Sequence, residues 1–170
     1  MDARKLTSIA AIAGLYTALT FVFAGISYGP VQFRIGEALA VLPVFGVIPV
    51  YGVTLGCFIS NLIGLFLGFA GTSVFDLAIG PIATFLAAKS CYYIGKTYNK
   101  VLIYVFAGFP PVLINGILIG LELTFLCHLG EVFIVNCLMV ALGEFVVCYG
   151  LGLFLIYIFF RNDLYKKLFY

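Results

Sequence analysis

The sequence predicts an all-α integral membrane protein in which a single domain, residues 1–170, forms six transmembrane helices with both termini in the cytoplasm. Of its 170 residues, 64% are hydrophobic and only 9% are charged, whereas soluble proteins carry about 25% charged residues. Residues 6–33 and 38–75 contain no Asp, Glu, Lys or Arg. Because six crossings need roughly 120 residues, we expect no second, soluble domain and no water-soluble enzyme.

Glycine, proline and polar clusters divide the apolar sequence into six predicted spans. These cover residues 5–27, 36–48, 51–70, 76–95, 101–125 and 132–160. Arg4 and Lys5 precede the first apolar stretch, as in a secretory signal. That apolar stretch is too long for a signal and more membrane sequence follows it, so we expect a retained helix.

The second and third spans are separated within one charge-free run, residues 38–75. This run is nearly twice the length of one crossing, and the helix breakers Gly46, Pro49 and Gly52 lie near its middle. The second span is therefore the one expected to be short or irregular.

Basic residues predict the orientation, because cytoplasmic loops of membrane proteins hold the excess of Lys and Arg. With six spans, seven basic residues fall on the side of the termini: Arg4, Lys5, Lys96, Lys100, Arg161, Lys166 and Lys167. Only Arg34 falls opposite. The termini are therefore predicted to be cytoplasmic, and the loops at 28–35, 71–75 and 126–131 to face outward.

Several chemistries are disfavoured. The five cysteines form no CxxC pair, and the net charge of +2 is not gathered on one face, so we expect neither a metal cluster nor nucleic-acid binding. Residues 90–97, SCYYIGKT, resemble a P-loop but begin with Ser90 and lie at the end of a membrane helix. Cys127, His128 and Glu131 lack a further metal ligand. We expect no metal, no cofactor and no catalytic residue, although a membrane enzyme using carboxylates as acid and base, or a purely structural subunit, remains an alternative.

Glu144 is the most informative single residue. It lies 12 residues inside the apolar run 132–160, about 18 Å from its start and near mid-depth. An intramembrane carboxylate suggests a ligand or proton site. The alternative is an interhelical hydrogen bond. Gly143, which has no side chain, could let a flat ligand approach.

Asn115 and Glu122 form a second candidate pair in the fifth span. They are seven residues apart, which is two helical turns, so they share a face. A carboxylate and an amide on one stripe can bind the edge of a heterocycle. Alternatively, Asn115 satisfies backbone groups freed by Pro110 and Pro111, and Glu122 lies at the water interface.

The first outer loop, residues 28–37, holds a turn, two aromatics, an amide, a cation and an acid. Arg34 and Glu37 are three residues apart at a helix start, which predicts a salt bridge between them and a favourable position for Glu37 on the helix dipole. Gln32 has no such structural role. It is therefore a candidate for ligand contact.

Two further polar residues are assigned mainly to structure. Asn61 lies inside the third span, and Asp76 heads the fourth, where it could be an N-cap. Ligand contact is the alternative for both.

Small residues recur every four positions in the first span, at Ala10, Gly14 and Ala18. Such a stripe lets two helix backbones approach closely. It could pack within the bundle or dock another subunit, and the spacing does not decide between them.

Five stretches stand out along the chain: YGPVQFRIGEAL (28–39), LGCFISNLIG (55–64), FDLAIGPIATFLAA (75–88), INGILIGLEL (114–123) and LGEFVVCYGLG (142–152). In this order they resemble the QueT family of queuosine-precursor transporters. The resemblance covers nearly the whole chain. That family comprises substrate-binding S components of energy-coupling-factor (ECF) transporters.

The resemblance implies an S-component-like bundle of six helices, multi-pass in a bacterial plasma membrane. It implies a small-molecule substrate, 7-aminomethyl-7-deazaguanine or a close relative, bound near the outer face. It also implies three partners: a transmembrane coupling subunit and two cytoplasmic ATPase subunits that supply the energy. Ala10, Gly14 and Ala18 would form the docking face. An S component for another flat vitamin, riboflavin or thiamine, is the alternative.

The chemistry of this ligand suggests roles for the candidate residues. Glu144 and Glu122 would accept from the guanine-like edge and the protonated aminomethyl arm, in either order. Asn115 and Gln32 would contact the ring carbonyl and nitrogen. Phe33 or Tyr28 would stack on the rings. The other candidates for substrate contact are Arg34, Glu37, Asp76 and Asn61.

Overall fold

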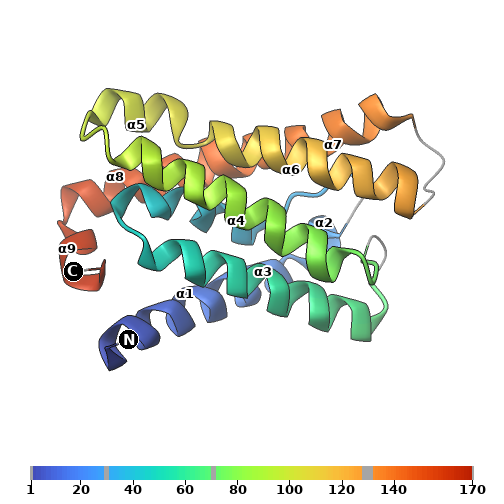
Figure 1. The fold of residues 1–170 in the computed structure, drawn as a ribbon, viewed down its shortest axis with the longest axis horizontal. Helices are drawn as coiled ribbons and strands as arrows, with labels where there is room; N and C mark the ends of the chain where they lie inside the picture. Colours follow the sequence, from blue (N-terminus) through green and yellow to red (C-terminus); the bar gives the residue numbers. More distant parts are fainter. Residues whose placement is uncertain (1, 29–30, 70–71, 128–131, 170) are drawn as a thin grey trace.

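The computed structural model describes residues 2–28, 31–69, 72–127 and 132–169, which form a bundle of helices (Figure 1). In chain order these are α1 (Ala3–Val22), α2 (Ala24–Ser27), η1 (Ile35–Phe45), α3 (Ile48–Leu67), α4 (Asp76–Gly95), α5 (Lys100–Phe106), α6 (Phe109–Leu121), η2 (Glu122–Leu126), α7 (Phe133–Phe145), η3 (Val146–Gly152), α8 (Leu153–Arg161) and α9 (Leu164–Phe169). The predicted all-helical fold is confirmed.

Five helical segments are long and apolar enough to cross a membrane. They are Ala3–Val22, Ile48–Leu67, Asp76–Gly95, Lys100–Leu126 and Phe133–Arg161. They correspond to five of the six predicted spans. The first is shorter than predicted, because the helix breaks at Phe23 and only the short α2 follows.

The second predicted span, residues 36–48, is different. It forms η1, a 3₁₀ helix of 11 residues, which at about 2.0 Å per residue is some 22 Å long and too short for a full crossing. Every residue from Gly36 to Phe45 is buried. A helix that is buried on all sides lies inside a bundle, and η1 accordingly packs against α1, α3, α4 and η3.

The segment before η1 brings the chain back along the bundle. Helices α1 and α3 run parallel, since Gly52 lies against Ile12 and Gly56 against Tyr16. The connection between two parallel helices must return the full length of the bundle. Residues 31–34, which lie outside the helices, and η1 together make this return.

Close backbone approach fixes η1 in place. A Cβ on Gly95 of α4 would strike the carbonyl oxygen of Val44. A Cβ on Gly36 would lie 2.8 Å from the carbonyl oxygen of Tyr16. Both contacts are tighter than any side chain permits, so glycine is required where η1 meets its neighbours.

The last two long segments are composite helices. Pro110 and Pro111 begin α6 just after a break at Ala107 and Gly108, as prolines favour the first turn of a helix. The π-helical turns η2 and η3 then interrupt α-helical geometry after Leu121 and Phe145. Such π segments are rare and often accompany functional sites.

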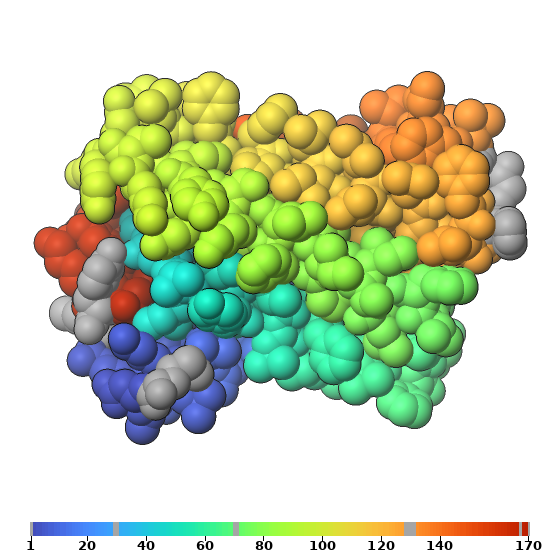
Figure 2. Space-filling model, in the orientation of Figure 1, coloured from blue at the N-terminus to red at the C-terminus, as the bar shows by residue number. Residues whose placement is uncertain are grey.

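Both chain termini lie at the same end of the bundle (Figure 1), where Ser8 Oγ donates to the carbonyl oxygen of Leu168 at 3.0 Å. The outer surface of the spans is apolar. Side chains of α3, α4 and α6 form one continuous face (Figure 2), and large apolar residues of several spans, including Leu15, Phe66, Ile82 and Leu142, are exposed. An apolar exterior of this kind suits a lipid environment.

Candidate functional site

Polar side chains gather inside this apolar bundle. Nine of the candidate residues are buried: Tyr28, Gln32, Arg34, Glu37, Asn61, Asp76, Asn115, Glu122 and Glu144. They come from the residues before η1, from η1 itself, and from α3, α4, α6, η2 and α7. Residues from six elements therefore meet in one interior.

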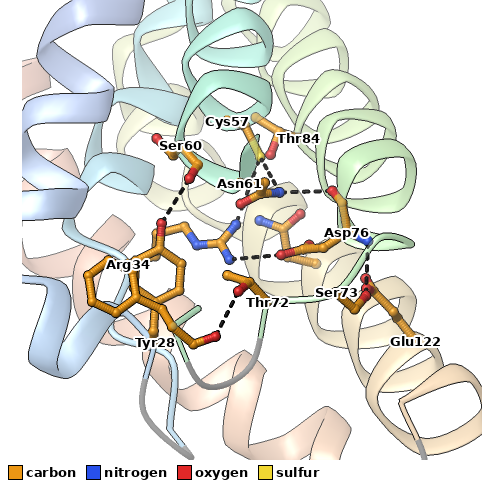
Figure 3. A network of polar contacts seen from close by, with 12 residues as sticks. Tyr28, Arg34, Cys57, Ser60, Asn61, Thr72, Ser73, Asp76, Thr84 and Glu122 are labelled. Atoms are coloured by element: carbon orange, nitrogen blue, oxygen red, sulfur yellow. Dashed lines mark hydrogen bonds and ion pairs between the residues drawn. The ribbon is translucent and has the colours of Figure 1, made fainter. Parts of the chain in front are cut away.

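Arg34 is at the centre of the first group, which we call the Arg34 network (Tyr28, Arg34, Cys57, Asn61, Ser73, Asp76 and Glu122; Figure 3). Its Nη2 lies 3.8 Å from Asp76 Oδ2, with both side chains buried, and its Nη1 lies 3.8 Å from Cys57 Sγ. Asn61 donates to the carbonyl oxygen of Asp76 at 2.9 Å. Thus α3 and the start of α4 hold the guanidinium and its partner in fixed positions.

Glu122 joins this network through Ser73. Ser73 Oγ donates to Glu122 Oε1 at 2.7 Å and accepts from the backbone N–H of Asp76 at 3.2 Å. Because Glu122 is the first residue of η2, the π-helical turn positions a carboxyl group beside the head of α4.

Tyr28 lies beside Arg34 at one side of the network (Figure 3). Its ring centroid lies 5.8 Å from Arg34 Cζ and 5.1 Å from the stacked ring of Phe69. Its hydroxyl donates to the carbonyl oxygen of Ser60 at 3.1 Å. Burial raises the pKa of this hydroxyl, so it stays a neutral donor.

A second group of buried polar residues is called here the Glu37–Glu144 network. It comprises Tyr16, Glu37, Thr84, Asn115, Glu144 and Cys148. Glu37 Oε1 accepts from the Tyr16 hydroxyl at 2.5 Å and from Thr84 Oγ1 at 3.1 Å. Glu37 is only 1% exposed. Side chains from α1 and α4 thus both donate to the same carboxylate oxygen.

Glu144 forms the other half of this group. Its Oε1 accepts from Asn115 Nδ2 at 2.9 Å. Cys148 Sγ lies 3.5 Å from Glu144 Oε2 and 3.5 Å from the backbone carbonyl of Glu37. Cys148 therefore links the Glu144 carboxyl to the backbone of Glu37 rather than to its carboxyl group, and the backbone of residues 34–37 joins this group to the Arg34 network.

Many polar atoms of the two networks lack a hydrogen-bond partner within the described residues. They comprise two donor atoms, Arg34 Nε and Nη2, and six acceptor atoms, Glu37 Oε2, Asn61 Oδ1, Asp76 Oδ1 and Oδ2, Asn115 Oδ1 and Glu122 Oε2. Buried polar atoms are normally paired, because an unpaired one costs about 1–3 kcal/mol. Eight such atoms in one interior are suited to hold a polar ligand rich in donors.

The predicted partner of Arg34 was wrong. Arg34 pairs with Asp76 rather than Glu37, because residue 34 precedes η1 in extended conformation and the side chain of Glu37 is held by Tyr16 and Thr84. Asp76 does not cap α4 through its side chain. The ion pair instead joins the η1 entry to α4.

Three further interpretations are corrected. Glu122 does not lie at a water interface, since it is 2% exposed. The Asn115 amide donates to Glu144 rather than to backbone freed by the prolines. Gly143 does not leave room for a ligand, because a Cβ there would strike the carbonyl oxygen of Gln32. Gly143 therefore lets the segment before η1 pack against α7.

The remaining candidates lie around the networks. Gln32 is buried and Phe33 is half-buried on the same segment. Ala10, Gly14 and Ala18 are all exposed along α1, and nothing lies within 4 Å of a Cβ built on Gly14. His128 and Glu131 lie outside the described residues. No group of three metal-ligating side chains occurs in the described part of the chain.

Sequence reasoning missed five residues that hold the carboxyl and guanidinium groups: Tyr16, Cys57, Ser73, Thr84 and Cys148. A Tyr, a Thr or a Cys is common in membrane helices and carries little signal alone. One signal was available for Cys57, which precedes Asn61 by one helical turn and so shares its face.

These features define a multi-helix membrane protein with a buried polar site suited to a small polar ligand. The chain belongs to the QueT transporter family, whose model matches residues 6–161. It is 33% identical over 147 residues to the queuosine precursor transporter QueT of Lactococcus lactis subsp. cremoris (strain MG1363), which covers 82% of this chain and 83% of that protein. No solved structure was found to match it.

Proposed function

We propose that this protein is the substrate-binding membrane subunit, or S component, of an ECF transporter that imports 7-aminomethyl-7-deazaguanine or a close relative. The observation that carries the proposal is the set of unpaired polar atoms in the two buried networks, in a member of a transporter family. Such an interior suits the binding of a polar ligand, and this role requires no catalytic residue.

The balance of donors and acceptors suits this substrate. The site offers unpaired acceptor atoms on three carboxyl groups and two amides, against one guanidinium. The ligand, conversely, has more donors than acceptors at its edge. Its ring N–H, exocyclic NH₂ and protonated aminomethyl arm donate, and its ring carbonyl accepts. Charge-assisted hydrogen bonds from such donors to carboxylates are about twice as strong as neutral ones.

The geometry suggests roles for individual residues. Arg34 has unpaired N–H donors and would donate to the ring carbonyl. Asn115 already donates to Glu144 and has a free acceptor, so it would accept from the ligand rather than donate. Tyr28 would stack on the flat rings. Of Glu122 and Glu144, one would accept from the guanine-like edge and the other from the cationic arm.

The energy for import would come from ATP hydrolysis in two cytoplasmic ATPase subunits, joined through a transmembrane coupling subunit. Residues 90–95 of the P-loop-like segment are helical, so this segment lacks the strand that precedes a P-loop. The exposed stripe of Ala10, Gly14 and Ala18 on α1 supports docking on such a subunit, because small residues allow close helix contact.

We also propose six crossings with both termini in the cytoplasm. Residues 31–34, if extended, and η1 together would span about 35 Å, which is enough to cross a hydrocarbon core of about 30 Å. Counting this return passage with the five long helices gives six passes. The excess of Lys and Arg at the end that holds the termini favours the cytoplasmic side.

Calorimetric titration of the purified protein tests the substrate. We expect saturable binding of 7-aminomethyl-7-deazaguanine, at least about tenfold weaker binding of guanine, which lacks the cationic arm, and no heat from riboflavin or thiamine. Asp163→Asn, at an exposed carboxyl outside both networks, serves as a control and should bind normally. Tight binding of riboflavin without binding of any deazapurine would overturn the proposed substrate.

A further inference from the structure

A cavity of about 280 Å³ lies at the end of the bundle that holds both termini, far from the Arg34 network. It opens between the end of η1, the end of α4 and the start of α5, and α8 and α9 contribute aromatic rings. Its lining includes Tyr92, Lys96, Tyr98, Lys100 and Phe160. Its volume is slightly below the range of about 300–1,000 Å³ of drug-sized pockets, which suits a headgroup better than a whole lipid.

The charge of the cavity is positive. Lys96 and Lys100 line it, and among the described residues neither lies within 4 Å of a carboxylate. Each is held over an aromatic ring instead: Lys96 Nζ lies 4.7 Å from the Tyr92 centroid, and Lys100 Nζ lies 5.1 Å from the Phe160 centroid. Rings orient the two ammonium groups without neutralising them.

Tyr98 completes the rim. It is 88% exposed and adopts a left-handed backbone conformation, with φ of 53°, which is unfavourable for a bulky side chain. Such strained residues are concentrated at functional sites. Tyr98 thus presents a ring and a hydroxyl at the mouth of a basic cavity.

We propose that this cavity binds the phosphate of an anionic phospholipid headgroup. Two unneutralised ammonium groups and a phenol suit a phosphodiester. Basic pockets between membrane helices bind such headgroups, and Tyr residues settle at the same depth of the bilayer. The site is distinct from the proposed substrate site and requires only that the protein resides in a bilayer.

The apolar part of the lining favours a lipid over a free phosphate. Phe45, Ile103 and Phe160 form much of the wall, and acyl chains next to a bound headgroup would cover the exposed apolar surface of the adjoining helices. A soluble phosphate gains nothing from these groups. The P-loop-like segment at the end of α4 thus contributes Lys96, the residue after the helix, to a phosphate site of another kind.

Native mass spectrometry of the detergent-purified protein tests the proposal. Titration with dioleoylphosphatidylglycerol and dioleoylphosphatidylcholine should show roughly 30-fold tighter binding of the anionic lipid, because both lipids carry the phosphate but the choline cation offsets its attraction to the two lysines. The double variant Lys96→Ala/Lys100→Ala should lose this preference, whereas Lys96→Arg/Lys100→Arg should keep it. Glycerol phosphate at the same concentration should not displace the lipid.

A matched control removes the same charge elsewhere at that end. Lys5→Ala/Lys166→Ala should retain the preference, because neither residue lines the cavity. Unchanged lipid preference in Lys96→Ala/Lys100→Ala, or displacement of the lipid by glycerol phosphate, would overturn the proposal. Binding of 7-aminomethyl-7-deazaguanine, measured on the same variants, should be unchanged. The two measurements therefore distinguish a failure of the lipid site from a failure of the proposed function.

Discussion

Arg34 and Asp76 form a buried ion pair whose atoms are 3.8 Å apart, too far for a hydrogen bond. Both Asp76 oxygens and the Nε and Nη2 of Arg34 have no hydrogen-bond partner in the described part of the chain. Apart from the contact of Arg34 Nη1 with Cys57 Sγ, the two side chains have no further hydrogen bonds in the described part of the chain, and a buried pair so poorly supported does not repay its desolvation. A loose pair of this kind therefore favours a role in ligand binding over a purely structural one.

Breaking the pair on one side should destabilise the fold. We expect Arg34→Met to lower the free energy of unfolding by about 3 kcal/mol, because it leaves the carboxyl of Asp76 buried and unpaired. Thermal unfolding in detergent measures the loss. The double variant Arg34→Met/Asp76→Leu removes both charges and should recover most of the stability.

Ligand affinity then separates the two roles of the pair. The double variant should be folded but should bind 7-aminomethyl-7-deazaguanine at least about 30-fold more weakly, since the site loses its only cation and one carboxyl group. Normal affinity in a stable double variant would show that the pair serves the fold alone.

Glu144 allows a sharper test of charge. Glu144→Gln retains the size of the side chain and an oxygen that can accept from Asn115, so the fold should be preserved. We expect affinity for 7-aminomethyl-7-deazaguanine to fall about tenfold in Glu144→Gln and further in Glu144→Ala, because a neutral amide replaces a charge-assisted acceptor. Calorimetry measures both. Full affinity in Glu144→Gln would contradict a charge-dependent role.

The charged and amide residues of the two networks were predictable individually, but their pairing and the Tyr, Ser, Thr and Cys residues that hold them were not. Glu144 and Glu122 stand out because a charge inside an apolar span needs a reason. The partner of Arg34 follows from tertiary structure: a spacing of three suggests Glu37 on a regular helix, but the chain enters η1 in extended conformation and turns Arg34 toward α4. Local sequence spacing contains no information about that turn.

At the scale of elements, η1 is the part that defines this bundle. It is buried along its length and meets α4 where Gly95 has no side chain. A tighter helix with a longer rise per residue covers more distance with fewer residues. This property lets a short segment return through a crowded interior between two parallel helices.

Substitution of Gly95 tests this packing. Gly95→Ala should lower the free energy of unfolding by about 2 kcal/mol or more, because the new Cβ strikes the backbone of Val44, which cannot move without displacing η1. Gly14→Ala is the matched control, since the space around Gly14 is open and alanine favours a helix. The unfolding temperatures in detergent should fall for the first and stay level or rise for the second. Equal behaviour of the two variants would contradict the close contact.

The long helices and a short or irregular second span were predictable, whereas the 3₁₀ geometry of η1 was not. A charge-free run of about 20 residues must form a helix in a membrane because every backbone group needs an internal partner. Residues 38–47 are apolar on all sides, so no periodicity distinguishes α from 3₁₀ geometry. The packing of Gly36 and Gly95 against their neighbours decides it, and these contacts are long-range.

At the scale of the whole molecule, the two ends of the bundle differ in charge. The end that holds both termini carries Lys96, Lys100 and Arg161, whereas Asp76 and Glu122 lie toward the other end.

We expect Thr97→Cys to react with a membrane-impermeant maleimide only in permeabilised cells, and Val132→Cys to react in intact cells. Both positions are exposed. The test uses a background in which Cys127 and Cys137, both partly exposed, are serine. The reverse pattern would place the termini outside.

The small-residue stripe on α1 is the surface through which the whole molecule would join its partners. Its three residues face outward and leave the bundle interior to Ile12, Ala13 and Tyr16. Gly14→Leu should therefore leave folding and deazaguanine binding intact, because nothing lies within 4 Å of its Cβ, but should reduce copurification of the coupling and ATPase subunits at least about tenfold, since a bulky side chain separates the two helix backbones. Gly150→Leu makes the same change at an exposed glycine of η3 that is equally unobstructed, and should copurify normally. Equal recovery of the partner subunits with both variants would show that docking uses another face of the bundle.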